Sequence, residues 1–164
     1  MQISLCAIAQ SVTLIGAANA APVALKRLLL DPYSDAVDGG LVLRDGRRPL
    51  GPSKTWRGVA FAVIVAASLS PLMGLSWRAG ALVGATAMAG DCMASFLKRR
   101  LGLAVSNRAL GLDQVLESLF PAISMRAYVQ LTAIDILIVV LLFSVGELVL
   151  SRGTFRLGLR DRPY

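Results

Sequence analysis

The sequence contains no histidine, and only two of its 164 residues are cysteines. The lack of histidine excludes imidazole as a general acid or base and as a metal ligand. Cys6 and Cys92 lie far apart in apolar stretches and in no motif. They are therefore expected to be small buried residues rather than a disulfide or a metal pair. A Walker A motif, internal repeats and low-complexity linkers are also missing, so residues 1–164 are expected to form one membrane-embedded domain.

Charged residues are scarce as well, at 16% of the chain, whereas 55% of the residues are hydrophobic. This exceeds the ~45–50% of soluble domains and predicts an all-α integral membrane protein. The apolar residues fall into five segments, which are predicted to be transmembrane helices: about 3–25, 59–75, 79–97, 110–125 and 127–150. The second and fourth are short for a bilayer that needs ~20 residues, so their ends must extend or the membrane must thin.

The positive charges are distributed unevenly between the segments. Fifteen of the 17 lysines and arginines lie in the loop 26–57, the loop 98–108 or the tail 152–162. The other two connections hold Arg78 and Arg126. By the positive-inside rule, the N-terminus is expected outside and the C-terminus in the cytoplasm, in the cell membrane, with the first segment kept as a helix. The net charge of +7 then reflects cytoplasmic loops and phosphate ligands rather than nucleic acid.

One cluster of charged side chains interrupts the apolar pattern. Asp91, Ser95, Lys98 and Arg99 have the spacing i, i+4, i+7 and i+8, which is one face of a helix. A carboxylate pair follows on the next helix at i, i+4, formed by Asp113 and Glu117. Inserting a charged side chain at membrane depth costs at least ~2.5 kcal/mol of free energy, so such residues usually belong to a functional site. The alternative is a helix-end ion pair worth ~0.3–0.5 kcal/mol, which would account for one pair but not for both sets.

The loop before the second segment ends in a basic, glycine-rich run. Gly51 and Gly58 would let the backbone approach a phosphate, and Lys54 and Arg57 would bind it. Thr55 is expected to be the N-cap of the following helix, whose N-terminus would then face an anion. An equally supported interpretation is a basic loop that contacts lipid head groups.

Two further features concern helix packing and the last segment. Gly80 and Gly84, four residues apart, predict close contact with a neighbouring helix. Asp135 is expected near the middle of the membrane, as a proton or substrate contact or as a partner of Asn19, and Glu147 near the cytoplasmic end.

Ordered matches along nearly the whole chain resemble the CDP-archaeol synthase family, small relatives of the phosphatidate cytidylyltransferases. The matches are Ala18-Asn19-Ala20-Ala21-Pro22; Asp38-Gly39, Asp45-Gly46-Arg47-Arg48, Gly51 and Lys54-Thr55-Trp56-Arg57-Gly58; Gly90-Asp91, Ser95, Lys98-Arg99-Arg100-Leu101-Gly102 and Asp113-Gln114; and Leu157-Gly158-Leu159-Arg160 with Pro163 and Tyr164. The family pattern Asp-Gln-x-Asp has Leu116 at its fourth position here, and the nearest acid is Glu117.

The resemblance implies a cytidylyltransferase of phospholipid biosynthesis, which transfers CMP from CTP to a phosphatidic-acid-type lipid and releases pyrophosphate. It implies that Asp91, Lys98 and Asp113 are catalytic, and that Asp91, Asp113 and Glu117 hold Mg²⁺. The binding residues it implies are Lys54, Thr55, Arg57, Ser95, Arg99 and Gln114. Expected partners are CTP, a lipid phosphate and the membrane, with a homo-oligomer as an option and no nucleic acid. Two alternatives stay open: a non-catalytic protein of the same fold that binds anionic lipid or a partner, and a small transporter with Asp91 and Asp135 as a relay.

Overall fold

The computed structural model describes residues 3–28, 35–103 and 111–156, the last five by their backbone only. Within these ranges the chain is all-helical, as predicted, apart from one isolated bridge between Ala36 and Thr55. The helices are α1 (Leu5–Leu28), α2 (Trp56–Leu69), the 3₁₀ helix η1 (Ser70–Met73), α3 (Trp77–Arg100), α4 (Leu112–Met125) and α5 (Ala133–Arg156). The closing motif at residues 157–164 and Arg108 lie outside the described residues.

Four helices of the described part are long and apolar enough to cross a membrane: α1, α2 continued by η1, α3 and α5. The prediction of an integral membrane protein is therefore confirmed. Helix α4, which is not among these four, has only 14 residues. It measures about 21 Å at 1.5 Å per residue, against a hydrocarbon core of ~30 Å. The predicted fourth segment thus forms a helix that is shorter than a full span.

Side-chain caps fix where the helices begin. Thr55 accepts a hydrogen bond from the N–H of Gly58, which confirms its prediction as the N-cap of α2. At α5, the carboxylate of Asp135 accepts hydrogen bonds from both the N–H and the hydroxyl of Thr132. It also accepts one from the N–H of Ser4, at the start of α1. The expectation that Asp135 lies near mid-membrane is therefore wrong: this capping box starts α5 six residues later than predicted, so Asp135 lies at a helix end.

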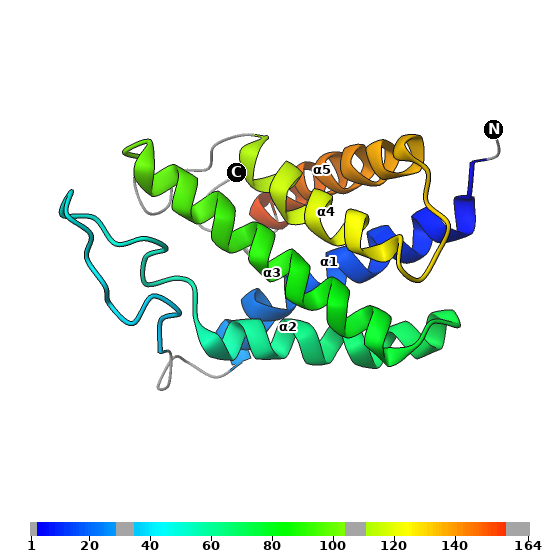
Figure 1. Cartoon of the computed structure of the whole chain (residues 1–164), viewed down its shortest axis with the longest axis horizontal. Coiled ribbons are helices and arrows are strands. Elements are labelled where there is room, and N and C mark those ends of the chain that lie inside the picture. The colour runs from blue at the N-terminus through cyan, green and yellow to red at the C-terminus, as the bar shows by residue number, and fades with distance from the viewer. Residues whose placement is uncertain (1–2, 29–34, 104–110, 157–164) are drawn as a thin grey trace.

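Helix α3 is the centre of the bundle and contacts α1, α2 and α4 (Figure 1). Two glycines bring it against α2, as predicted: a Cβ on Gly80 would lie 2.1 Å from the carbonyl oxygen of Ala66, and one on Gly84 would lie 2.7 Å from the Cα of Val63. Six residues after Gly84, Gly90 brings α3 against α4. A Cβ there would lie 2.2 Å from the carbonyl oxygen of Leu116. Only a residue without a side chain permits these approaches.

The buried core consists mainly of aliphatic and methionine side chains, among them Leu14, Val83 and Val139, together with Phe143. One side of α5 instead exposes a row of large aliphatic residues at helical spacing: Leu137, Leu141, Val145 and Val149. In a membrane protein this row is the surface that the acyl chains cover. Both cysteines are free, but Cys6 is exposed and Cys92 is half-buried, so the expectation of buried cysteines is wrong. Cys6 lies in the first turn of α1.

Residues 35–55, here called the basic loop, extend from the end of the bundle at which α3 finishes (Figure 1). The last turns of α1 and α3 are at this end, and they carry Lys26, Arg27 and the run Lys98, Arg99 and Arg100. The N-terminus of the chain lies at the opposite end (Figure 1). The fold thereby gathers the basic loop and two basic helix ends at one end of the bundle, called the basic end below.

Candidate active site

The basic loop and α3 meet at an ion pair. The ammonium of Lys54 bonds both oxygens of the Asp91 carboxylate, although the two residues are 37 positions apart in the sequence. Both side chains are only 20% exposed. Burial of the ammonium lowers the pKa of Lys54, but the charge of Asp91 and the hydrogen bond to it outweigh this, so the net shift of the pKa is upward. Lys54 therefore stays cationic at neutral pH.

A second carboxyl group adjoins this pair. Glu117 on α4 lies within hydrogen-bonding distance of Asp91, and it is close enough to Lys54 and Glu147 for their charges to act on it. The cause is the close contact at Gly90, because α4 reaches α3 at Leu116, one residue from Glu117. Two carboxylates this close repel each other unless a proton or a cation lies between them. The sequence placed Glu117 beside Asp113, whereas the fold places it beside Asp91.

A second lysine–carboxylate pair lies on the same two helices. Lys98 Nζ is 2.8 Å from the carboxylate of Asp113, which is in the first turn of α4. The alternative interpretation of the sequence was an ion pair within α3, between Asp91 and the cations two turns later. The structure instead joins each acid to a lysine of another segment, so that the acids of α3 and α4 and the two lysines form one polar site.

The other predicted binding residues divide into two groups. Ser95, Arg99 and Gln114 are buried in the helix ends around the site. Arg99 donates from Nη1 to the carbonyl of Leu103, and Gln114 accepts from the N–H of Gly111 through its side-chain oxygen. The amide nitrogen of Gln114 has no hydrogen-bond partner within the described residues. Thr55 and Arg57 begin α2 and line a small pocket together with Lys26.

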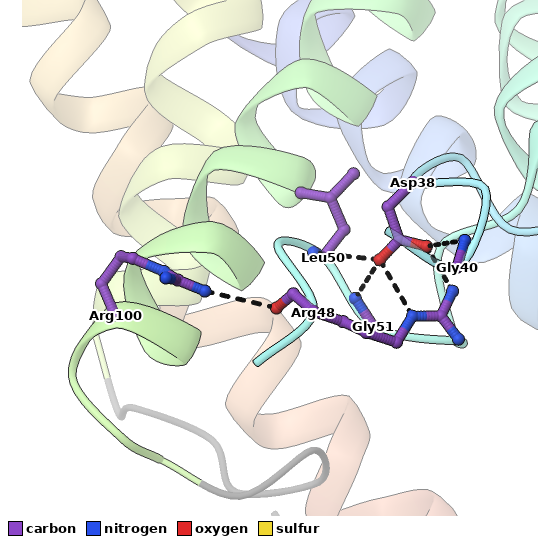
Figure 2. Close-up of polar contacts among 6 residues, drawn as sticks. All are labelled: Asp38, Gly40, Arg48, Leu50, Gly51 and Arg100. Atoms are coloured by element: carbon purple, nitrogen blue, oxygen red, sulfur yellow. Dashed lines mark hydrogen bonds and ion pairs between the residues drawn. The ribbon is translucent and has the colours of Figure 1, made fainter. Parts of the chain in front are cut away.

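Asp38 organises the basic loop, and sequence reasoning did not assign it a role. Its side chain is 1% exposed and forms an ion pair with Arg48. It also accepts hydrogen bonds from the N–H groups of Gly40, Leu50 and Gly51 (Figure 2). The bond to Arg48 is the main cause that holds the pKa of Asp38 well below its usual value, against the opposing effect of burial and with help from the N–H groups. Gly51 has a φ of +88°, which strains other residues and lets the chain turn toward Lys54.

Three contacts attach the basic loop to the end of α3. Arg100 bonds the carboxylate of Asp45 at 2.5 Å and the carbonyl of Arg48 at 3.5 Å (Figure 2 shows the latter). Arg47 donates to the carbonyl of Arg99 at 3.3 Å. The loop is therefore folded on itself by Asp38 and fixed to α3 by arginines. The sequence showed only that the basic loop and the end of α3 both contain arginines. It could not show which groups pair, because the partners are more than 50 residues apart.

The donor set can be compared with what a magnesium ion requires. No group of three or more acidic or cysteine side chains in the described ranges has the geometry of a metal site. Mg²⁺, however, is commonly held by one or two carboxylates together with substrate phosphates and water. Asp91 and Glu117 supply two adjacent carboxyl groups of that kind. They fit such an ion, and Asp113, bonded to Lys98, lies on the same side of α4's first turns.

A polar site at one end of a bundle of membrane-spanning helices defines the class of protein: an integral membrane protein with its functional groups at the membrane surface. A family model described as CarS-like, CDP-archaeol synthase, matches residues 73–164, more than half of the chain. The chain therefore belongs to the CDP-archaeol synthase family.

Individual relatives agree with this assignment. The chain is 32% identical to the CDP-archaeol synthase of Sulfurisphaera tokodaii over 73% of this chain and 76% of that protein. It is 38% identical to the enzyme of Hyperthermus butylicus over 60% of each chain, and 31% identical to that of Thermofilum pendens over 90% of this chain and 75% of the relative. Several matches thus span less than two thirds of the relative's length.

A solved structure has the same fold. It is described as an intramembrane enzyme for archaeal membrane lipid biosynthesis, and it superposes with a TM-score of 0.74. The sequence identity is 28%, and the match covers 86% of this chain and 90% of the other.

Proposed function

We propose that this protein is a membrane cytidylyltransferase that transfers CMP from CTP to a phosphatidic-acid-type lipid phosphate. The observation that carries the proposal is the polar site at the basic end, where Lys54 and Lys98 lie against Asp91 and Asp113 with Glu117 beside them. Cations that bind phosphates and carboxylates that bind a divalent metal are what nucleotide transfer needs, and membership of the CDP-archaeol synthase family supports the same reaction.

In this reaction an oxygen of the lipid phosphate attacks the α-phosphorus of CTP. A new P–O bond forms, the bond between the α-phosphorus and the bridging oxygen to the β-phosphorus breaks, and pyrophosphate leaves. Positioning and charge neutralisation account for most of the rate in such transfers, so the lack of histidine is no obstacle. Lys54, Lys98 and Arg57 bind and orient phosphate groups, and the basic loop brings Lys54 to the site.

Mg²⁺ is the proposed cofactor. Asp91 and Glu117 would hold it, with Asp113 as the third predicted ligand. When bound, the ion supplies charge neutralisation for the phosphate oxygens. Gly90 matters because it lets α4 bring Glu117 to Asp91. Leu116 stands at the position of the family acid and contributes its backbone to that contact. Glu117, one residue later, would therefore supply the carboxylate in its place.

The membrane orientation belongs to the same proposal. CTP is a cytoplasmic nucleotide, so the basic end must face the cytoplasm and the N-terminus the outside. The concentration of lysine and arginine at that end supports this orientation.

The test uses purified protein, labelled CTP, Mg²⁺ and a panel of ester- and ether-linked lipid phosphates. Asp91→Asn and Asp113→Asn should each abolish the formation of CDP-lipid, because Asn keeps the shape but loses the charge that a hard cation needs. Their double variant should be little worse than either alone. Glu117→Gln should raise the Mg²⁺ concentration needed for half-maximal rate.

Asp135→Asn is the matched control, because it removes a carboxylate at the opposite end of the bundle. It should lower the melting temperature and leave the Mg²⁺ requirement unchanged. A wild-type protein that is inactive on the whole panel would refute the proposal in favour of a non-catalytic protein of the same fold. A transporter with Asp91 and Asp135 as a relay loses its basis, because Asp135 caps α5 through Thr132 and Ser4.

A further inference from the structure

A small pocket lies between the end of α1 and the start of α2, separate from the carboxylates of the active site. Its walls come from the last turns of α1, the end of the basic loop and the first turn of α2. The residues that matter for its chemistry are Pro22, Leu25, Lys26, Ser53, Thr55 and Arg57. Among the described residues, none that lines the pocket is acidic.

The polar wall of this pocket suits an anion. Lys26 and Arg57 contribute two positive charges, and within the described residues no ion pair holds the ammonium of Lys26. Because the oxygen of Thr55 accepts a hydrogen bond from Gly58, its own hydroxyl proton can be donated elsewhere. Thr55 also caps α2, a helix of 14 residues, so the positive end of the helix dipole adds to the field. A phosphate group has the charge and the acceptor atoms for these donors.

The other wall of the pocket is apolar and lies at the level of the lipid head groups. Pro22, one turn before Lys26 on α1, and Leu25, directly before Lys26, form this wall. Helix α1 has 24 residues, or about 36 Å at 1.5 Å per residue, enough to cross the ~30 Å hydrocarbon core. Lys26, in its last turn, is therefore at the boundary between the acyl chains and water. An anion bound there can carry hydrocarbon chains toward Leu25.

The backbone separates this pocket from Asp91. Thr55 has the extended dihedral angles φ −121° and ψ 145° and forms a bridge with Ala36. Side chains alternate in extended backbone, so Lys54 and Thr55 point to opposite sides. Lys54 bonds Asp91, whereas Thr55 lines the pocket. A lipid phosphate would be repelled by the carboxylates near Asp91, whereas the described residues that line this pocket include Lys26 and Arg57 and no acid.

We propose that this pocket receives the phosphate group of the lipid acceptor, with Lys26 and Arg57 as its charged ligands. The proposal rests on the proposed function and adds where the second substrate binds. It gives a role to Lys26, which sequence analysis counted only as one of the positive residues that orient the chain. The lipid phosphate held here must still pass the segment Lys54–Arg57 before its oxygen can attack the α-phosphorus of CTP, so the pocket is the docking site of the acceptor and not the place of transfer.

The chain offers a matched pair of variants for the test. Lys26→Ala and Arg27→Ala each remove one positive charge from the last turn of α1, but only Lys26 lines the pocket. Loss of a charge-assisted hydrogen bond should raise the KM for the lipid phosphate about tenfold in Lys26→Ala, with the KM for CTP unchanged. Arg27→Ala should change neither constant, and Lys26→Arg should restore the lipid KM. Equal effects of Lys26→Ala and Arg27→Ala would overturn the proposal, because attraction to the membrane surface would then account for both.

Direct binding separates this proposal from the proposed function. Dioctanoyl phosphatidic acid, titrated into the detergent-solubilised wild-type protein without CTP, should bind about tenfold more tightly than to Lys26→Ala, since one charged contact is lost. This result is expected even if the wild type shows no turnover, in which case the cytidylyltransferase proposal fails and the pocket stands. Inorganic phosphate that binds as tightly as the lipid would show that the pocket selects free phosphate, and would overturn the lipid assignment.

Discussion

Gly90 is the residue whose substitution tests most directly how the fold builds the site. An added Cβ would lie 2.2 Å from the carbonyl oxygen of Leu116 and 2.8 Å from its carbon. Close C···O contacts are normally ~3.3 Å, so α3 and α4 must separate by about 1 Å at this point. The obstacle is backbone and cannot rotate away. Overpacking of this size costs about 1–3 kcal/mol of stability.

The separation would act on the carboxylates next to it. Asp91 follows Gly90, and Glu117 follows Leu116, so a shift of α4 moves one acid away from the other. A misplacement of about 1 Å in an active site can lower a rate ~100-fold. Gly90→Ala should therefore reduce CDP-lipid formation about 100-fold and raise the Mg²⁺ requirement, while the protein still inserts and folds. Turnover and the melting temperature in detergent are the two measurements.

Two glycines of the same chain provide the controls. Gly80→Ala creates an equal clash, 2.1 Å from the carbonyl oxygen of Ala66, but it does so against α2 and ten residues away from Gly90. It should lower the melting temperature as much as Gly90→Ala and affect turnover far less. Gly16→Ala meets nothing within 4 Å and should change neither quantity adversely. If Gly90→Ala and Gly80→Ala lose activity in proportion to their loss of stability, the reasoning about the acid pair is refuted.

Three further predictions concern the basic loop and the orientation of the chain. The pKa of Asp38 is depressed, so its contribution to stability is present above the usual carboxyl pKa and is lost as the pH falls toward the lower value of the folded protein. The amide of Gly51 should therefore keep its protection from hydrogen exchange, corrected for intrinsic rates, from pH 7 to about 4. Loss of that protection by pH 5 would contradict this reasoning. Arg100→Ala removes two of the contacts that hold the loop on α3, so the KM for CTP should rise severalfold with little change in the melting temperature. An unchanged KM would show that the remaining contacts are enough to dock the loop. In a variant without native cysteines, single cysteines at Ser76 and Ser106 should be labelled from opposite sides of the membrane, and labelling from the same side would exclude the proposed orientation.

The features that were predicted correctly from the sequence are local ones. The Thr55 cap follows from a threonine directly before an apolar run, and the close contact at Gly80 and Gly84 follows from their spacing on one helix face. The features that were missed depend on tertiary structure. Asp135 was predicted to lie near mid-membrane because it falls inside a long apolar segment. Hydropathy alone does not show that a capping box starts the helix at this residue.

The site itself was predicted as a set of residues and not as a set of pairs. Helical spacing brings Asp91 near Lys98 on paper, yet Lys98 reaches across to Asp113 on α4. The partner of Asp91, Lys54, comes from a loop that folds back on the helix. The pair between Lys98 and Asp113 depends on how Gly90 places α4 against α3, which no periodicity in the sequence reveals.

The two lysine–carboxylate pairs have a consequence for how ligands can enter. Lys54 is neutralised by Asp91, and Lys98 is neutralised by Asp113. A free cation that approaches the acids must compete with the ammonium groups, and a free anion that approaches the lysines must compete with the carboxylates. A ligand that brings both charges at once, such as a nucleotide with its metal, can exchange partners with each pair in a single event. The two pairs therefore favour a ligand that carries both charges over a lone metal ion or a lone phosphate.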